Sequence, residues 1–165
     1  MNSPTTWRAA VQTATRDLGL LALRLWAAQE FVLAGYTKLA GGWAAPAWFA
    51  GLDFPFPHGL LNADANWLLA GVGEVALGLA LALGVCSRLA ALGLLYITYV
   101  AVYTVHFDLG WAGWNQIETE GGLGFKVPLM LAVMLLAIAT QGAGQYALDA
   151  WRRRARHPAT EATPA

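Results

Sequence analysis

Four long apolar runs divide this chain, and polar, glycine-rich and aromatic segments separate them. The runs cover residues 18–37, 67–86, 89–105 and 127–141. Apolar residues are continuous within each run and do not alternate with polar ones, which favours helices over the strands of a barrel. About 20 apolar residues cross the hydrocarbon core of a bilayer as a helix. The pattern therefore predicts an all-α fold, an integral membrane four-helix bundle.

The fourth run is the shortest. It reaches the length of a membrane span only if residues 122–126 join its helix. Pro128 would then lie in the first helical turn, where proline is tolerated because the N–H group that it lacks has no helical partner there. We therefore expect the fourth span to cover residues 124–141.

The connections between the runs predict how the helices are arranged. Residues 87–88 leave room only for a tight turn, so the second and third helices should be antiparallel neighbours. The connection at residues 39–66 is rich in Gly, Pro and aromatic residues, which indicates a cap packed at the membrane interface. Residues 1–17 and 150–165 flank a four-helix domain of residues 18–149, and the second flank is a basic tail with the composition of a flexible segment.

Composition agrees with a membrane protein, and the placement of charge predicts its orientation. Hydrophobic residues make up 58% of the chain and charged residues 12%, about half of the charge that a soluble domain carries. Ten basic and ten acidic residues cancel, so the net charge gives no indication of nucleic-acid binding. One side of the predicted bundle carries Arg8, Arg16, Arg88, Arg152, Arg153, Arg154 and Arg156. The other side carries only Lys38 and Lys126. The positive-inside rule therefore predicts cytoplasmic termini and external long loops.

Three ionisable residues lie inside the apolar runs: Arg24, Glu30 and Glu74. Each costs at least ~2.5–3.5 kcal/mol when it faces lipid without a partner, so all three should face the bundle interior or water. Counting from the ends of the runs puts Glu30 and Glu74 at one depth, ~10 Å below the outer boundary. Tyr99 and Tyr103 of the third run belong to the same predicted polar layer. We take Glu74 and Glu30 as candidate catalytic residues that handle protons. The candidate binding residues are Arg24, Lys38, Arg88 and the two tyrosines.

Two cations are candidate partners of Glu74. Arg24 and Lys38 share one face of the first helix, and Glu30 points away from that face. Arg24 could extend toward Glu74 on the next helix, and Lys38 ends the same stripe. A buried carboxylate beside a redox or transport site would handle protons, whereas a structural ion pair would only set the helix register. The sequence leaves both interpretations open.

Few residues suit a metal or a haem. A haem in a membrane bundle needs paired histidines on facing helices, whereas His58 lies in a loop and His106 at the end of a run, so haem is not expected. The same two histidines are weak candidates for a copper or zinc site, because both lie on the outer side. The single cysteine, Cys86, forms no CxxC pair, which argues against a quinone-linked disulfide oxidase.

Three stretches resemble the DoxX family of small membrane proteins. RLWAAQEFVLAGYTKL resembles its opening helix, GVGEVALGLALALGVCSRLAALGLL its second and third helices, and GGLGFKVPLMLAVMLLAIATQGAGQYALD its last helix and exit. The similarity covers roughly residues 24–149, and the order of the three motifs is more specific than any one of them. By this resemblance, the recurring polar and glycine positions of the family are Arg24, Gly35, Lys38, Glu74 and Arg88.

The resemblance implies several functional settings. DoxX-like proteins take part in sulfur oxidation, in oxidant defence at the membrane and in the maturation of copper-binding peptides. The related DoxD proteins are described as a membrane subunit of thiosulfate:quinone oxidoreductase. Function does not follow from fold alone, so a role in quinone chemistry remains an analogy here.

The leading hypothesis is a multi-pass protein of the bacterial inner membrane that serves as the membrane component of a redox system. Quinone is the candidate cofactor, and a soluble or membrane partner would supply electrons to a subunit that is not an autonomous enzyme. Two alternatives stay open: a non-enzymatic membrane anchor for a redox or copper-peptide system, and a small-molecule or metal-ion transporter. A homo-oligomer is also left open.

Overall fold

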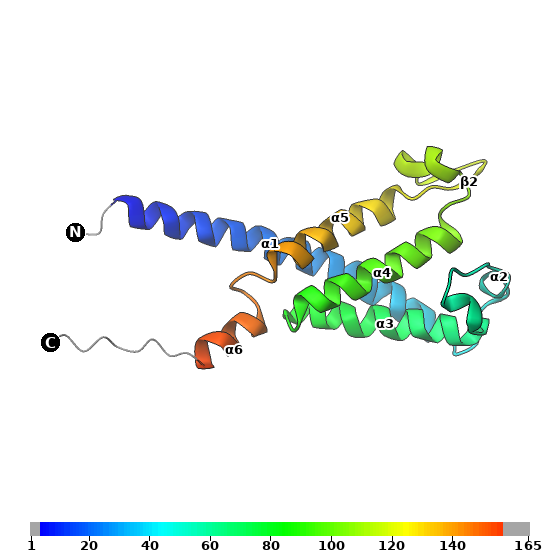
Figure 1. Ribbon diagram of the computed structural model, residues 1–165, viewed down its shortest axis with the longest axis horizontal. Coiled ribbons are helices and arrows are strands. Elements are labelled where there is room, and N and C mark those ends of the chain that lie inside the picture. The colour runs from blue at the N-terminus through cyan, green and yellow to red at the C-terminus, as the bar shows by residue number, and fades with distance from the viewer. Residues whose placement is uncertain (1–3, 157–165) are drawn as a thin grey trace.

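Four long helices form the body of the molecule in the computed structural model, which describes residues 4–156. They are α1 (Pro4–Ala40), α3 (Ala63–Leu83), α4 (Ser87–Val105) and α5 (Lys126–Gln141). Each packs on the next along the chain, and α5 returns to contact α1, so the four helices close into a bundle (Figure 1). Short elements complete the fold: α2 (Ala47–Ala50), the 3₁₀ turns η1 (His58–Leu60) and η2 (Gly110–Asn115), the hairpin of β1 (Glu118–Thr119) with β2 (Gly122–Leu123), and α6 (Leu148–Arg156). The predicted all-α class is confirmed.

Three helices are long and apolar enough to cross a membrane: Asp17–Ala40, Ala63–Leu83 and Ser87–Val105. The fourth apolar helix, α5, has 16 residues. The expectation that residues 122–126 lengthen it is wrong, because Gly122 and Leu123 form β2 and the helix begins at Lys126. Pro128 lies in its first turn, as expected.

The outer surface of the bundle is as apolar as its core. Small and branched residues fill the interior, including Ala27, Ala28, Leu81, Ala91, Leu94, Leu135 and Ile138. Equally apolar residues point outward, among them Leu25, Leu33, Leu79, Leu92, Val133 and Leu136. A soluble bundle would place polar residues on the outward face. This surface is suited to lipid.

The helix boundaries differ from the predicted ones at both ends of the bundle. The turn between α3 and α4 is formed by Gly84, Val85 and Cys86 rather than by residues 87–88, and Gly84 adopts φ +73° as the C-cap of α3. The first helix continues beyond its apolar run to Pro4. Residues 150–156, expected to belong to a flexible tail, form most of α6, and the remainder of that tail lies outside the described residues.

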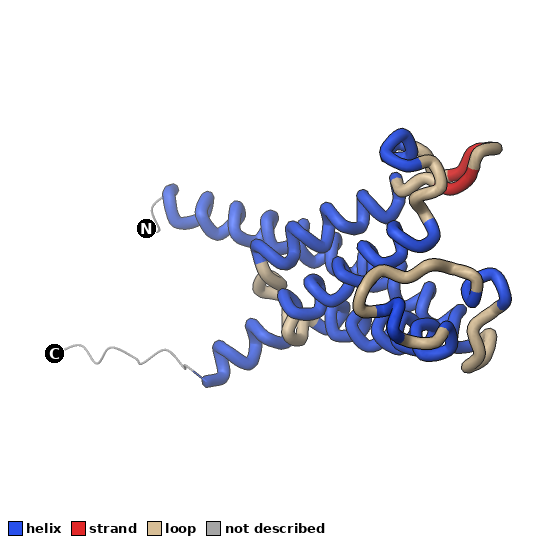
Figure 2. Tube along the Cα trace, turned by 45° about the vertical axis from the view of Figure 1, so that its right-hand side comes forward, coloured by secondary structure: helices blue, strands red, loops and turns tan. Residues whose placement is uncertain are grey.

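The bundle has two structurally different ends (Figure 2). At one end, residues 41–62 and 106–125 form two folded loops, and we call this the loop end. At the other, the α3–α4 turn meets the segment that joins α5 to α6, residues 142–147, and we call this the turn end. The predicted cap at residues 39–66 is indeed folded, since it contains α2 and η1 and packs on α3.

Candidate functional site

Glycines bring α1 and α3 together near the loop end. A Cβ atom on Gly35 would lie 2.6 Å from the carbonyl oxygen of Gly71 and 2.9 Å from Cβ of Glu74. Gly35 leaves no room for a side chain, and a Cβ on Gly71 would lie only 3.1 Å from the side chain of Leu39, so the two backbones approach closely, as small residues allow in membrane helices. This contact sets which residues of the two helices face one another.

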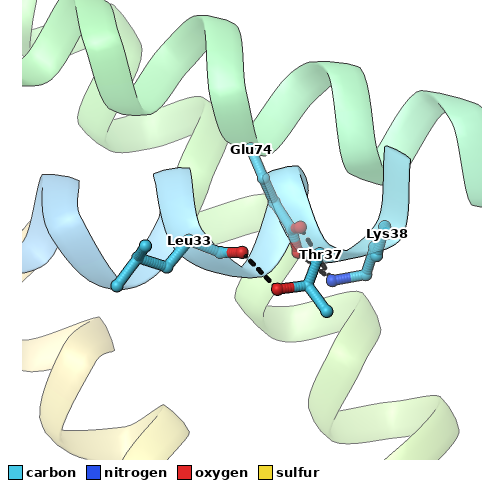
Figure 3. A network of polar contacts seen from close by, with 4 residues as sticks. All are labelled: Leu33, Thr37, Lys38 and Glu74. Carbon is cyan, nitrogen blue, oxygen red and sulfur yellow. Dashed lines mark hydrogen bonds and ion pairs between the residues drawn. The ribbon is translucent and has the colours of Figure 1, made fainter. Parts of the chain in front are cut away.

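The close approach lets Lys38 reach Glu74 across the interface. The ammonium Nζ donates to Oε1 at 2.9 Å and to Oε2 at 2.7 Å (Figure 3). The side chain of Glu74 is 8% exposed and that of Lys38 23%. In the described part of the chain this is the only ion pair between side chains within 4 Å. Of the two partners that the sequence leaves open for Glu74, the structure selects Lys38.

Arg24 does not approach Glu74. Its guanidinium is almost fully buried at the turn end, where it donates to the carbonyl oxygens of Ala143 at 2.7 Å and Tyr146 at 2.8 Å. A longer bond reaches Ala82 in the last turn of α3. The guanidinium also lies beside the position of Gly84, about ten residues or ~15 Å along α3 from Glu74. The expected Arg24–Glu74 contact is therefore wrong, and Arg24 fastens residues 142–147 to the end of α3.

Glu30 also lies apart from Glu74. Gly35 of α1 faces Glu74, and Val32 faces Gly78, so Glu30 is level with residues near 79. That is ~7 Å deeper than Glu74. The predicted common depth is wrong because the ends of the two helices are staggered: Lys38 and Leu39, at the end of α1, lie against Gly71, and α3 continues beyond that level to Ala63. Glu30 remains partly exposed.

A cavity of about 230 Å³ opens beside the Lys38–Glu74 pair, between α3, α4 and the cap. Apolar and aromatic side chains make up most of its wall: Trp48, Phe49, Phe54, Leu69, Ala70, Tyr96, Ile97, Val100, Ala101 and Val105. The polar residues that line it are Lys38, Glu74, His58, Asn66, Thr104 and His106. A mostly apolar pocket with a few convergent polar groups is the usual form of a small-molecule site. We take it as the candidate functional site.

Aromatic stacking holds the cap over this cavity. The ring of Phe49 lies 4.9 Å from that of Trp67 and 5.1 Å from that of Phe54, measured between centroids. Trp48 contacts Trp67 edge-on at 6.1 Å. The backbone N–H of Ala45 donates to Asp64 at the start of α3, which ties the loop to that helix. The cap is thus a packed wall of the site.

His58 is held in one orientation by Asn66. The amide Nδ2 of Asn66 donates to the carbonyl oxygen of His58 at 3.0 Å, which leaves Oδ1 to face the ring Nδ1 at 2.8 Å. Nδ1 must then be the donor in this contact, and Nε2 takes no part in it. Sequence patterns do not identify Asn66 as a site residue, because a polar residue directly before an apolar run is common at the start of a membrane helix.

His106 lies at the C-cap of α4, outside the three candidate spans. Burial lowers the pKa of its imidazole, and nearby Asp108 and the backbone of Gly124 oppose this shift only in part. The ring is therefore neutral near pH 7. Within the described residues, no three His, Cys, Asp or Glu side chains gather as a metal site. The cavity does bring together both histidines considered as weak metal candidates.

The predicted binding residues of α4 do not line the cavity. Tyr96, Tyr99 and Tyr103 form a row of rings 6.4 Å apart, and only Tyr96 reaches the cavity, 5.6 Å from the ring of His58. Tyr99 and Tyr103 are each 54% exposed on the outer face. Arg88 lies at the turn end, where it lines a second cavity.

These features define a class of protein: a multi-pass helical membrane protein with an ion pair beside an aromatic-capped cavity. A family model described as DoxX matches residues 19–107. An uncharacterized protein of Haemophilus influenzae is 39% identical over 134 residues, which cover 80% of this chain and 82% of the relative. The chain belongs to the DoxX family, and the resemblance found in the sequence is confirmed. No solved structure matches it.

Proposed function

We propose that the loop-end cavity binds the head group of a membrane quinone and that the protein is the membrane component of a redox system. One observation carries this proposal: the Lys38–Glu74 ion pair lines a cavity whose wall is mostly apolar and aromatic. The volume of about 230 Å³ suits one substituted ring without its isoprenoid tail. Leu69 and Tyr96 line the cavity and are also 54% and 44% exposed on the outer face. The tail could therefore leave between α3 and α4 into lipid.

The chemistry follows from the charge that quinone reduction creates. A quinone takes up two electrons and two protons, and its oxygens become basic as electrons arrive. The Lys38 ammonium can donate a hydrogen bond and then a proton to such an oxygen, and Glu74 stabilises the ammonium beforehand. Nε2 of His58 offers a second proton-exchanging group at the cavity. Electrons would come from a partner protein.

A bulky residue in the cavity tests quinone binding directly. Ala101→Phe places a ring in the cavity, and Leu92→Phe adds a ring on the outward face of the same helix as the matched control. Decylubiquinone binding to the full chain in nanodiscs can be followed by tryptophan quenching, because Trp48 and Trp67 adjoin the site. Ala101→Phe should weaken binding roughly tenfold, and Leu92→Phe should leave it unchanged. Equal binding by both variants would refute the quinone site.

Glu74→Gln separates binding from chemistry. The amide keeps the size of the side chain but no longer holds the Lys38 ammonium as an ion pair. Decylubiquinone should still bind, whereas quinone reduction by native membranes that contain the partner should be lost. Full turnover by this variant would exclude the proton-handling role.

A second candidate function is an anchor for a soluble redox or copper-peptide partner, and the exposed aromatics of the loop end favour it. Trp43, Phe56 and Trp111 are 78%, 84% and 80% exposed. Replacing all three by serine should abolish capture of a partner while decylubiquinone binding is retained. If the triple variant keeps activity in native membranes, the anchor role is wrong.

We further propose four crossings of the bacterial inner membrane with the turn end in the cytoplasm, from the positions of the arginines. Cys86 is the single cysteine and is exposed at that end. A membrane-impermeant maleimide should label Cys86 in inverted vesicles and not in intact spheroplasts. A Trp111→Cys variant that also carries Cys86→Ser should show the reverse. Labelling of both sites from one side would contradict this topology.

A further inference from the structure

A second cavity of about 670 Å³ lies at the turn end, which the proposed quinone site does not use. It is bounded by the start of α4, the segment 142–145 and the inner side of α6. Asp149 donates its backbone N–H to the carbonyl oxygen of Gly84, which hooks α6 onto the end of α3 beside this cavity. Unlike the loop-end cavity, its wall is rich in polar and charged residues.

The N-terminus of α4 lies at this cavity, because Cys86, Ser87 and the two residues after them line it. The helix begins at Ser87 and has 19 residues, and its N-cap, Cys86, supplies no side-chain hydrogen bond. The first N–H groups of a helix have no internal partners, and the helix dipole adds partial positive charge there. Helix N-termini with these properties bind anions such as phosphate.

Ser87 provides an independent indication of a ligand. Its residue is 2% exposed and lines the cavity. Its hydroxyl has no hydrogen-bond partner among the described residues. A buried hydroxyl without a partner destabilises a protein, so nearly all such groups are satisfied by protein, water or ligand. An anion at the start of α4 would accept the hydrogen bond that the rest of the chain does not.

Three arginines line the same cavity: Arg88, Arg153 and Arg154. None has a carboxylate within 4 Å in the described part of the chain. Two carboxylates also line the cavity. Asp17 accepts a hydrogen bond from the backbone N–H of Gln145 at 3.3 Å, and Asp149 lies in the first turn of α6, where a negative charge is favourable. Cations outnumber anions, and both carboxylates are engaged with backbone dipoles.

We propose that this cavity binds a phosphate group, with the α4 N-terminus and the Ser87 hydroxyl as donors and Arg88, Arg153 and Arg154 as the cationic rim. Arginine suits phosphate because its planar fork donates two parallel hydrogen bonds. The group is presented by the head group of an anionic phospholipid or arrives as free phosphate. Exposed Leu89 lines the cavity, as expected where acyl chains meet head groups.

Charge-matched variants test the site in the full chain. Arg88→Gln and Arg152→Gln remove the same charge from exposed positions at one end, but only Arg88 lines the cavity. Native mass spectrometry with phosphatidylglycerol and phosphatidylcholine measures lipid retention, and thermal shift with inorganic phosphate measures the free anion. Arg88→Gln should weaken the binding of one of the two ligands roughly tenfold, and Arg152→Gln should weaken it less than twofold. The ligand affected identifies the source of the phosphate.

Ser87→Ala distinguishes a binding site from an unfavourable buried group. Without ligand, the variant should melt at the same temperature as the parent or slightly above it, because an unpaired hydroxyl has been removed. The stabilisation by phosphate or phosphatidylglycerol should be lost. If Arg88→Gln and Arg152→Gln behave alike with both ligands, or if Ser87→Ala is stabilised as much as the parent, the phosphate site is wrong.

Discussion

Lys38 and Arg24 are two cations of the same helix, but their partners differ. The partner of Lys38, at the loop end, is a side-chain carboxylate, whereas the partners of Arg24, at the turn end, are backbone carbonyl oxygens. Lys38 faces a carboxylate beside a cavity that a small molecule could enter. Arg24 is enclosed by three backbone carbonyl oxygens and is 2% exposed. An ion pair at a cavity can exchange a proton or a hydrogen bond with a ligand, whereas a guanidinium whose two terminal nitrogens donate to carbonyls holds the chain in place. Burial of a charge is thus weaker evidence for chemistry than the identity of its partners.

The largest expected effect is on the Arg24 side of this comparison. Arg24→Gln leaves up to three partly buried carbonyl oxygens without their donor, and because such a loss costs about 1–3 kcal/mol for a buried group, a total near 4 kcal/mol is expected. The melting temperature in detergent measures it. Arg24→Lys should restore little of the lost stability, because one ammonium nitrogen cannot reach all the carbonyl oxygens to which the two guanidinium nitrogens donate. A melting temperature close to that of the parent for Arg24→Gln would show that the carbonyl contacts do not matter.

Substitutions in the Lys38–Glu74 pair should reduce the free energy of unfolding by less, and the effects of the two substitutions should be coupled. Glu74→Gln or Lys38→Gln each leaves one charge without its partner, at about 3 kcal/mol. The double variant should lose less than the sum of the two. Glu74→Gln combined with Arg24→Gln should be additive, since these residues share no contact. Additivity in the Lys38 cycle, measured by thermal unfolding, would show that the ion pair is not formed.

Gly35→Ala tests whether close packing creates the pair. The new Cβ would lie 2.6 Å from a backbone oxygen of α3, so the helices must separate at a cost of about 1–3 kcal/mol. The coupling between Lys38 and Glu74 should fall with it. Gly19→Ala is the matched control on the same helix, because nothing lies within 4 Å of its Cβ. That control should be neutral or slightly stabilising. Equal melting temperatures for the two variants would contradict this account.

The smallest expected effect is the pH dependence contributed by His106. Because burial lowers its pKa in the folded state, the unfolded chain binds the proton more readily at mildly acidic pH. Stability should therefore decrease as pH falls below the ordinary histidine value of 6.5 and should be fully present above it. Melting temperatures between pH 7.5 and 5 should fall less in His106→Gln than in the parent. A profile that is unchanged by the substitution would assign the pH dependence to other groups.

Sequence patterns located the helices better than they located the contacts between them. The apolar runs were found because continuous hydrophobicity is a property of neighbouring residues. The predicted register failed for Glu30 because α3 extends past the end of α1 at the loop end, and hydropathy along the chain does not show how the ends of two helices are staggered. Sequence patterns also missed Asn66 and Ser87, because the role of each depends on groups that are not adjacent to it in the sequence. Asn66 contacts His58, and Ser87 lines the turn-end cavity.

The sequence by itself determined that this chain forms apolar helices with a folded cap, and its motifs determined the DoxX family. Hydropathy and short motifs both depend on residues that are neighbours in the sequence, so neither requires the tertiary structure. Only the tertiary structure decided that Lys38, and not Arg24, meets Glu74. The partner of Glu74 depends on the register of α1 against α3 along their axes, and the close contact of Gly35 with Gly71 sets that register. A shift of one helical turn, about 5.4 Å, would replace one set of facing side chains by another without altering any apolar pattern. The identity of the pair is therefore a consequence of packing.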